Sequence, residues 1–151
     1  MIYKFYFAYG MNTNNTEMEN RCPLSVNSNI QAIHYDHRLA FRGVADFEKA
    51  EGYKLYGNLW LITDICEKAL DKLEGYPTLY TKQYIQVFDK RGNIYNTMIY
   101  KMNCEDYNEP SKYYWDCLKK GYKKNNLPYK QLQKARQYSS KFKKRPILKV
   151  V

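Results

Sequence analysis

A chain of 151 residues fits one domain of ordinary size, and 44% hydrophobic and 17% aromatic residues are enough to fill a core. No apolar run approaches the roughly 20 residues of a membrane span, and residues 1–8 lack the features of a secretory signal. We therefore expect a single cytoplasmic domain over residues 1–151, without a membrane partner. The four cysteines form no CxxC pair, which argues against a zinc site and favours free thiols, with two disulfides as the alternative.

The net charge of +10 is concentrated near the C-terminus. Residues 112–149 contain 13 of the 25 Lys and Arg residues and one acid, Asp116, so the rest of the chain is slightly negative. A solvated helix face is the simpler interpretation of this segment. The alternative is a surface for an anionic partner such as nucleic acid, with interleaved Tyr and Lys residues supplying stacking and charge.

In chain order, the apolar pattern predicts strands joined by turns, with helices between and after them. Runs of β-branched and aromatic residues predict strands at residues 2–8, 30–41, 53–62, 83–89 and 94–102, where 30–41 is one long strand or two shorter ones. Glycine-containing segments predict a turn at residues 9–12, a loop or bulge at 42–46 and a hairpin connection at 90–93. The polar segment 13–21 predicts a short helix, and Gly57 predicts a bend or a close backbone approach within its strand.

The best-defined helix follows the third strand. Asp64 and Glu67 have the spacing of a capping box, and Gly75 followed by Pro77 marks the end of the helix. The spacing of four apolar residues predicts the buried face, which consists of Ile65, Ala69, Leu70 and Leu73.

Two further helices are predicted after Pro110, the first with Ser111 as its N-cap and the second over residues 128–138. A basic segment follows from about residue 139 to residue 151. We expect either that Ile147, Leu148 and Val150 order this segment or that it frays. Strands with one internal helix and two terminal helices indicate an α+β domain with a largely antiparallel or closed sheet.

Several common catalytic arrangements are excluded. The chain has no GxGxxG, no GxxxxGK[ST] and no GxSxG motif. Its two histidines, His34 and His37, lie three residues apart in a predicted strand, so their side chains are expected on opposite faces, where they cannot share a metal.

Glu74 and the turn after the first strand are the residues that suggest chemistry. A carboxylate in the last turn of a helix opposes the helix dipole by roughly 0.3–1 kcal/mol, and Glu74 lies about 40° beyond Leu70, at the margin of the apolar stripe. Such local conflicts are expected at functional sites, although an exposed glutamate is the commoner explanation. Gly10 lets the backbone approach a ligand, and N–H groups in such a turn can hold a carboxylate. An ordinary turn without a ligand would have the same sequence features.

Five ordered segments together resemble the γ-glutamylcyclotransferase superfamily, which includes the AIG2-like proteins. The run YFAYGMN with a later RCP is similar to the family's YFAYGSN…RCP opening, and the others are similar to its GVAD, G-x-L-Y/W, LDxxEG and PSxxY…LPxxY elements. The segments lie at residues 6–12 with 21–23, 43–46, 56–60, 70–75, and 110–114 with 121–129. The resemblance covers about residues 3–135 and favours the γ-glutamylcyclotransferase branch over the γ-glutamylamine branch.

The resemblance implies a small, mixed, partly closed β-barrel flanked by helices. It also implies an enzyme that uses no metal or cofactor and releases 5-oxoproline from a γ-glutamyl compound. Glu74 matches the family's general acid/base, and Tyr114 matches a tyrosine that reaches the substrate. The γ-glutamyl-binding loop would comprise Tyr6, Phe7, Ala8, Tyr9, Gly10, Met11 and Asn12, with Tyr80 and Tyr100 as pocket-wall residues.

Met11 departs from the family pattern, which has a small Ser at this position. If only the backbone N–H acts there, Met is tolerated; if the hydroxyl holds substrate, or Met intrudes, affinity or activity changes. The alternative function is a catalytically altered family member that binds nucleic acid or another polyanion. The γ-glutamyl substrate and the oligomeric state, including a homodimer, are left open.

Overall fold

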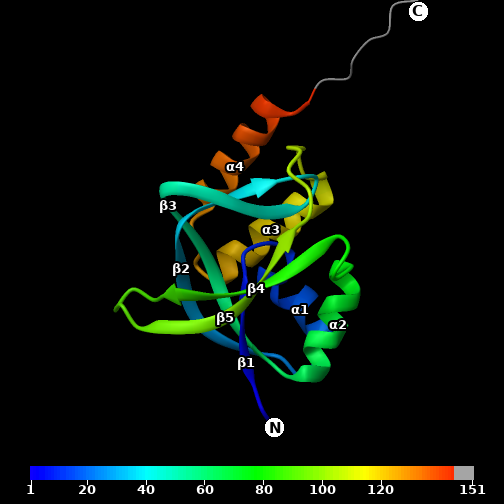
Figure 1. The fold of residues 1–151 in the computed structure, drawn as a ribbon, viewed down its shortest axis with the longest axis vertical. Helices are drawn as coiled ribbons and strands as arrows, with labels where there is room; N and C mark the ends of the chain where they lie inside the picture. The colour runs from blue at the N-terminus through cyan, green and yellow to red at the C-terminus, as the bar shows by residue number, and fades with distance from the viewer. Residues whose placement is uncertain (145–151) are drawn as a thin grey trace, which may run out of the picture.

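The computed structural model describes residues 1–144, in which five strands close into a barrel with four α-helices around it (Figure 1). The strands are β1 (Lys4–Ala8), β2 (Val26–Phe41), β3 (Ala45–Ile62), β4 (Tyr80–Phe88) and β5 (Ile94–Met102). Their order is β1-β3-β2-β4-β5, and β5 returns to pair with β1 in parallel, while the other pairs are antiparallel. The predicted α+β class and mixed barrel are confirmed.

β2 and β3 form one long hairpin in which both strands exceed their predicted length. β2 begins at Val26 rather than at residue 30, and β3 begins at Ala45 rather than at residue 53. The pairing of β2 with β3 contains two register shifts, and Asn29 and Asp36 adopt positive φ angles of 59° and 61° beside them. These irregularities interrupt the two-residue alternation on which the strand prediction depends, so the polar parts of both strands were missed.

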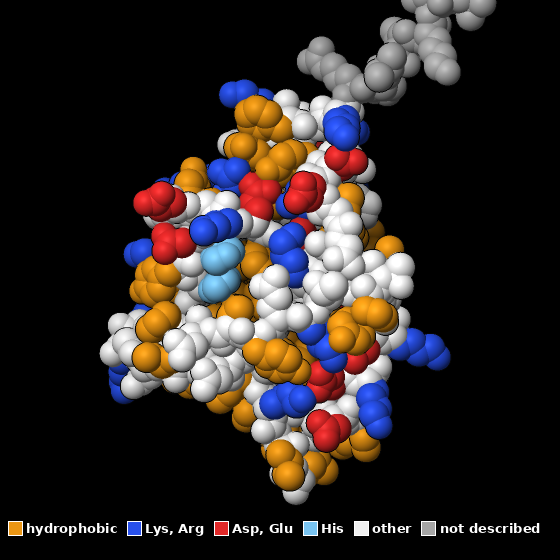
Figure 2. Space-filling model, in the orientation of Figure 1, with side chains coloured by type: hydrophobic (Ala, Val, Ile, Leu, Met, Phe, Trp, Pro, Cys, Tyr) orange, Lys and Arg blue, Asp and Glu red, His pale blue; other side chains and the backbone are white. Residues whose placement is uncertain are grey.

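The two histidines lie side by side on one face of the molecule (Figure 2), so the prediction of opposite faces is wrong. The rings of His34 and His37 stack with centroids 3.9 Å apart, because the register of β2 shifts between Tyr35 and His37. Burial and the neighbouring His37 lower the pKa of His34 to about 4. Within residues 1–144, no group of three or more His, Cys, Asp or Glu side chains is placed to hold a metal ion.

The helices are α1 (Asn15–Arg21), α2 (Asp64–Glu74), α3 (Lys112–Lys124) and α4 (Tyr129–Phe142), and a short 3-10 turn, η1 (Met11–Thr13), precedes α1. Ser111 caps α3 as predicted, since its hydroxyl accepts a hydrogen bond from the Tyr114 N–H at 3.2 Å. Gly75, at φ 65°, ends α2 as predicted. The N-cap of α2 is Thr63 rather than Asp64: its hydroxyl accepts from the Cys66 N–H at 3.2 Å.

The buried face of α2 differs from the predicted one. Ile65 is 70% exposed and Leu73 is 49% exposed, whereas Cys66, Glu67 and Leu70 are buried. The apolar pattern misled because a charged residue occupies a buried position: hydrogen bonds from Lys4 and Lys82 hold the Glu67 carboxylate. Glu74, four residues after Leu70, is half-buried, which agrees with its predicted place at the margin of the buried face.

α4 runs to Phe142, four residues beyond its predicted end, and includes residues 139–142 of the predicted basic segment. The fully buried Ser139 favours the extension, because its hydroxyl donates to the carbonyl oxygens of Ala135 and Phe41 at 2.8 and 3.2 Å. The remaining basic residues at 145–151, with Ile147, Leu148 and Val150, lie outside the described residues.

β1 separates two apolar clusters that cover its opposite sides. Phe7 and Tyr9 pack with residues of α3 and α4, whereas Tyr6 and Ala8 pack with residues of α1 and α2. The close approach predicted at Gly57 is confirmed, since a Cβ there would lie 2.5 Å from Phe7 Cζ. All four cysteines are thiols, and none of the helices in residues 1–144 has the length and apolarity to cross a membrane.

Candidate active site

A cavity of about 340 Å³ lies where the turn after β1 faces the C-terminal end of α2. Nine of the eleven residues predicted for the site line it: Tyr6, Tyr9, Gly10, Met11, Asn12, Glu74, Tyr80, Tyr100 and Tyr114. The sequence analysis missed six further lining residues: Arg21, Val44, Ala45, Leu73, Leu79 and Met102. Among these, Arg21 lies in the RCP segment, and Val44 and Ala45 lie in the GVAD segment. Both segments contribute to the family resemblance, but no role in the site was predicted for their residues.

Phe7 and Ala8 do not line the cavity. Both are buried in β1, Phe7 against Gly57 and the α3/α4 cluster and Ala8 in the α1/α2 cluster. Their place in the strand that leads into the turn gives them a supporting position, because β1 pairs with β3 over its whole length.

Glu74 is the only acidic residue among the described residues that line the cavity. Burial raises the pKa of its carboxyl to about 6, and the positive charge of Arg21 opposes this rise. Within residues 1–144, no hydrogen bond or ion pair engages the carboxylate. The group is therefore available to a ligand and titrates close to neutral pH.

A chain of three side chains orders the turn opposite Glu74. The Arg21 guanidinium donates to Asn12 Oδ1 at 2.6 Å, which fixes the orientation of the amide. Asn12 Nδ2 consequently donates to the Tyr6 hydroxyl at 3.0 Å. Gly10 is required at the turn, because a Cβ there would lie 2.8 Å from the Ala45 Cβ.

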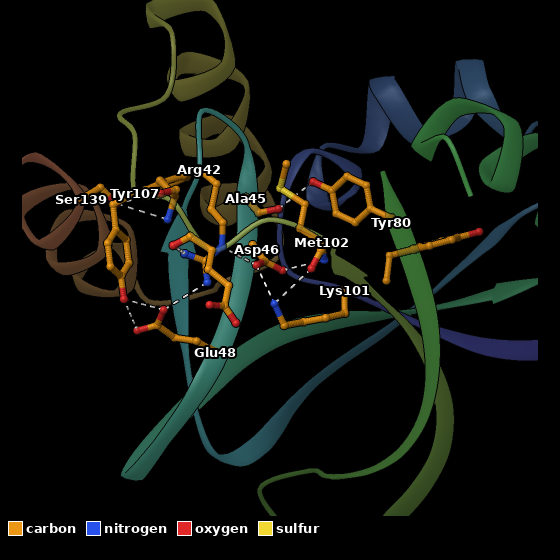
Figure 3. A network of polar contacts seen from close by, with 12 residues as sticks. Arg42, Ala45, Asp46, Glu48, Tyr80, Lys101, Met102, Tyr107 and Ser139 are labelled. Atoms are coloured by element: carbon orange, nitrogen blue, oxygen red, sulfur yellow. Dashed lines mark hydrogen bonds and ion pairs between the residues drawn. The ribbon is translucent and has the colours of Figure 1, made fainter. Parts of the chain in front are cut away.

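Three of the five tyrosines around the cavity have hydroxyl protons that are already used within the protein. Tyr9 donates to the Tyr100 carbonyl oxygen at 2.6 Å, and Tyr100 donates to Asp71 Oδ1 at 2.6 Å. Tyr80 donates to the Ala45 carbonyl oxygen at 2.9 Å (Figure 3). These hydroxyls shape the wall and hold the elements together, but their protons do not point to a ligand.

The other two tyrosines accept hydrogen bonds and keep their own protons. Tyr6 accepts from Asn12, and Tyr114 accepts from the Ala45 N–H at 3.0 Å. Burial raises the pKa of both hydroxyls above the ordinary value, so both are protonated at every physiological pH. Tyr6 and Tyr114 are therefore the two hydroxyl donors that the site offers to a negative or polarised oxygen.

The backbone of Ala45, which contacts two of these tyrosines, is fixed by the residue that follows it. The Asp46 carboxylate is fully buried and accepts from Arg42 Nε at 2.6 Å, from Lys101 Nζ at 2.7 Å and from the Met102 N–H at 2.9 Å (Figure 3). The prediction of a loop or bulge over residues 42–46 is wrong for Ala45 and Asp46, which begin β3, because this network holds them against β5. Removing one member of such a buried charge network typically destabilises a protein by about 3–5 kcal/mol.

Met11 begins η1 and is one of the residues that line the cavity. Its carbonyl oxygen accepts from the Asn14 N–H at 2.9 Å, so the backbone of the turn is closed on itself. At the position where the family pattern has Ser, the cavity is thus lined by a residue without a side-chain hydroxyl.

Comparisons with known proteins agree with the fold. A model of the AIG2-like family matches residues 54–134. A search of curated protein sequences found no match. Among solved structures, a γ-glutamyl cyclotransferase superposes with a TM-score of 0.78 at 22% identity, over 99% of this chain and 94% of that one.

Two further solved structures share the fold. An uncharacterized protein from Homo sapiens has a TM-score of 0.77 at 22% identity, over 99% of this chain and 94% of that one. An AIG2-like protein from Mus musculus has a TM-score of 0.60 at 15% identity, over 76% and 83%. Since the family model spans more than half of the sequence and the barrel matches these folds, the chain belongs to the AIG2-like family.

Proposed function

We propose that this protein is a γ-glutamylcyclotransferase-type enzyme that releases 5-oxoproline from a γ-glutamyl amino acid or a γ-glutamyl amine. The observation that carries the proposal is one cavity in which the Glu74 carboxyl, at the end of α2, faces the Gly10 turn of β1. The fold likeness to a γ-glutamyl cyclotransferase supports the same activity. The four free thiols support a cytoplasmic setting.

The reaction is an intramolecular acyl transfer, so the site must fold the substrate and move protons. The α-amine attacks the γ-carbonyl carbon, a C–N bond closes the five-membered ring, and the bond to the leaving nitrogen breaks. Because both reacting groups belong to one molecule, holding them in a near-attack geometry supplies a large part of the rate. Tyr6 and Tyr114 would donate to the carboxylate and the carbonyl oxygen of the glutamyl group, and Arg21 would balance its charge.

Glu74 would carry the protons. Its carboxylate takes the two protons that the α-ammonium group loses, one before the attack and one as the ring closes, and passes each to the departing nitrogen, so that the protonated amine and 5-oxoproline leave without a net change in Glu74. A pKa of about 6 suits both steps, because a group that titrates near the working pH can act first as a base and then as an acid.

The proposal predicts 5-oxoproline release whose kcat/KM falls as the pH decreases through about 6. Below that pH Glu74 is protonated and cannot act as a base. Incubation with a panel of γ-glutamyl compounds, with 5-oxoproline measured by chromatography between pH 5 and 8, is the test. Arg21→Met should move the acid limb to higher pH, because the guanidinium charge opposes the rise in the pKa of Glu74. The absence of 5-oxoproline from every compound would refute the activity.

A second candidate function rests on a groove of about 890 Å³ between α4 and the β2–β3 hairpin, which shares no lining residue with the cavity. The described residues that line it include one acid, Glu51, and nine basic or aromatic residues: Arg38, Lys54, Lys130, Lys134, Lys141, Tyr53, Tyr56, Tyr138 and Phe142. Lysines beside exposed rings are typical of surfaces that bind single-stranded nucleic acid. This would make the protein a binding module, with or without turnover.

If the groove binds single strands, the affinity for a labelled oligonucleotide should decrease steeply with salt concentration, because phosphate contacts release counterions. The double variant Lys130→Glu and Lys134→Glu should then weaken binding by about tenfold and flatten the salt dependence. Lys120→Glu with Lys124→Glu is the matched control, since it changes the same charge on exposed positions of α3 outside the groove. Equal losses in both variants would indicate attraction to net charge rather than binding in the groove.

A further inference from the structure

A buried tyrosine outside the cavity holds the backbone of the turn that faces Glu74. Tyr122 of α3 is 1% exposed and packs in the same apolar cluster as Tyr9. It does not line the cavity, but its hydroxyl donates to the Tyr9 carbonyl oxygen at 2.6 Å. This oxygen belongs to the peptide bond that joins Tyr9 to Gly10, so Tyr122 acts on the turn from the side of α3.

Gln131 of α4 determines the direction of this hydrogen bond. Its Oε1 accepts from the Tyr56 N–H at 2.8 Å, and its Nε2 donates to the Tyr56 carbonyl oxygen at 2.9 Å. These two bonds fix the orientation of the amide, because only its oxygen accepts and only its nitrogen donates. Nε2 also donates to the Tyr122 hydroxyl at 2.9 Å, so the proton of that hydroxyl is directed to Tyr9. Burial raises the pKa of Tyr122, which keeps this proton in place at neutral pH.

The bond to Tyr9 also sets the direction of the Gly10 N–H. The peptide bond between these residues is trans, since the only cis bond within residues 1–144 joins Tyr76 to Pro77. In a planar trans peptide the carbonyl and N–H bonds point in opposite directions. The carbonyl oxygen is held toward Tyr122, so the N–H points away from it. Gly10 lines the cavity, and its N–H donates to no other described residue.

The next peptide bond of the turn is fixed locally. The Gly10 carbonyl oxygen accepts from the Thr13 N–H at 3.0 Å and from the Thr13 hydroxyl at 2.7 Å. By contrast, the Tyr122 hydroxyl is the one group within residues 1–144 that donates to the Tyr9 carbonyl oxygen. The orientation of the Tyr9–Gly10 peptide therefore depends on α3 and α4, which are distant from it in the chain.

We propose that Tyr122, oriented by Gln131, is a positioning residue that aims the Gly10 N–H at the γ-carbonyl oxygen of the substrate. This inference rests on the proposed function. Negative charge develops on that oxygen as the α-amine attacks, and it is lost when the bond to the leaving nitrogen breaks. A donor that is fixed in advance stabilises such a charge without reorganisation. Tyr122 does not touch the substrate, so its contribution is made through Gly10.

Tyr122→Phe removes the hydroxyl and keeps the buried ring. We expect kcat for 5-oxoproline release to fall by about tenfold, while KM changes by less than about twofold. Ser139→Ala is the matched control, because it removes a buried hydroxyl of α4 that donates to the Phe41 carbonyl oxygen outside the cavity. This control should keep the wild-type kcat. An unchanged kcat in Tyr122→Phe, a loss confined to KM, or equal losses of kcat in both variants would overturn the proposal.

Two substitutions of Gln131 separate the direction of the proton from packing. In Gln131→Glu a carboxylate oxygen replaces Nε2 and accepts the Tyr122 proton, which leaves the Tyr9 carbonyl oxygen without its donor. We expect kcat to fall by about tenfold, with no further loss when Tyr122→Phe is added. Gln131→Met removes three hydrogen bonds but supplies no acceptor, so Tyr122 still donates to Tyr9 and kcat should stay within about twofold of wild type. A larger loss of kcat in Gln131→Met than in Gln131→Glu would contradict the assigned proton direction.

The wild-type protein distinguishes failure of this inference from failure of the proposed function. If no γ-glutamyl compound yields 5-oxoproline with wild type, the proposed function is refuted and the role of Tyr122 is refuted with it. If wild type is active and Tyr122→Phe has the same kcat, only the role of Tyr122 is refuted.

Discussion

Replacing Glu74 with Gln is expected to lower kcat for 5-oxoproline release by about 10²- to 10⁴-fold, with KM changed far less. Gln keeps the size and polarity of the side chain but can neither take the proton of the attacking amine nor return it to the leaving nitrogen. Steady-state kinetics with a γ-glutamyl amide, followed by 5-oxoproline formation, measure the loss. Full activity in the variant would show that Glu74 is not the acid/base.

The same substitution should make the folded protein more stable above pH 6. The folded-state pKa of Glu74 is about 6, above the ordinary value of 4.5. A raised folded-state pKa means that the folded protein favours the protonated carboxyl. The resulting stabilisation is present below the unfolded-state pKa and is lost as the pH rises through the folded-state pKa. The ionised carboxylate therefore lowers the free energy of unfolding by roughly 2 kcal/mol at pH 8. Glu74→Gln should therefore match wild type in the free energy of unfolding near pH 4 and exceed it near pH 8.

Glu67 provides a matched control on the same helix. Burial alone would raise the pKa of its carboxyl, but hydrogen bonds from Lys4 and Lys82 lower the pKa below the ordinary value. Glu67→Gln should thus destabilise the protein at neutral pH, the opposite of Glu74→Gln, while 5-oxoproline release continues. Urea unfolding at both pH values decides the signs, and destabilisation by both variants at pH 8 would contradict the assigned environment of Glu74.

Tyr114→Phe is expected to lower kcat by about 10²- to 10³-fold, the effect of removing one donor from a site that stabilises a developing negative charge. The Tyr114 hydroxyl accepts from the Ala45 N–H, so its own proton is available to the substrate oxygen. Single-turnover kinetics separate this loss of rate from any loss of binding.

Tyr80→Phe is the control for Tyr114→Phe. Tyr80 also bonds to Ala45, but it donates its proton to the carbonyl oxygen and has none to offer the substrate. Both variants remove one hydrogen bond to the same residue, so a merely structural role predicts similar losses of stability and of rate. A loss of kcat confined to Tyr114→Phe supports the proton assignment, and equal losses in kcat would reject it.

Local sequence signals predicted the elements that depend on neighbouring residues. Ser111 and Gly75 determine ends of helices because a side-chain cap and a left-handed residue act within one turn. The turn at Gly10 and the helix that ends at Glu74 were predicted for the same reason. Local signals failed where distant partners decide the outcome. Glu67 of α2 is held in a buried position by Lys4 of β1 and Lys82 of β4, and the register shift before His37 turns its ring toward His34.

The sequence by itself determined the α+β class through periodicity and capping. The order of its motifs carried the family resemblance, and the resemblance implied the barrel and the two segments of the site. Only the tertiary structure decided that Glu74 and Gly10 face one cavity, since closure of the barrel through β1 and β5 brings their segments together. It also decided which tyrosines keep a proton for a ligand. Burial and hydrogen-bond direction depend on neighbours far away in the chain, and no local pattern records them.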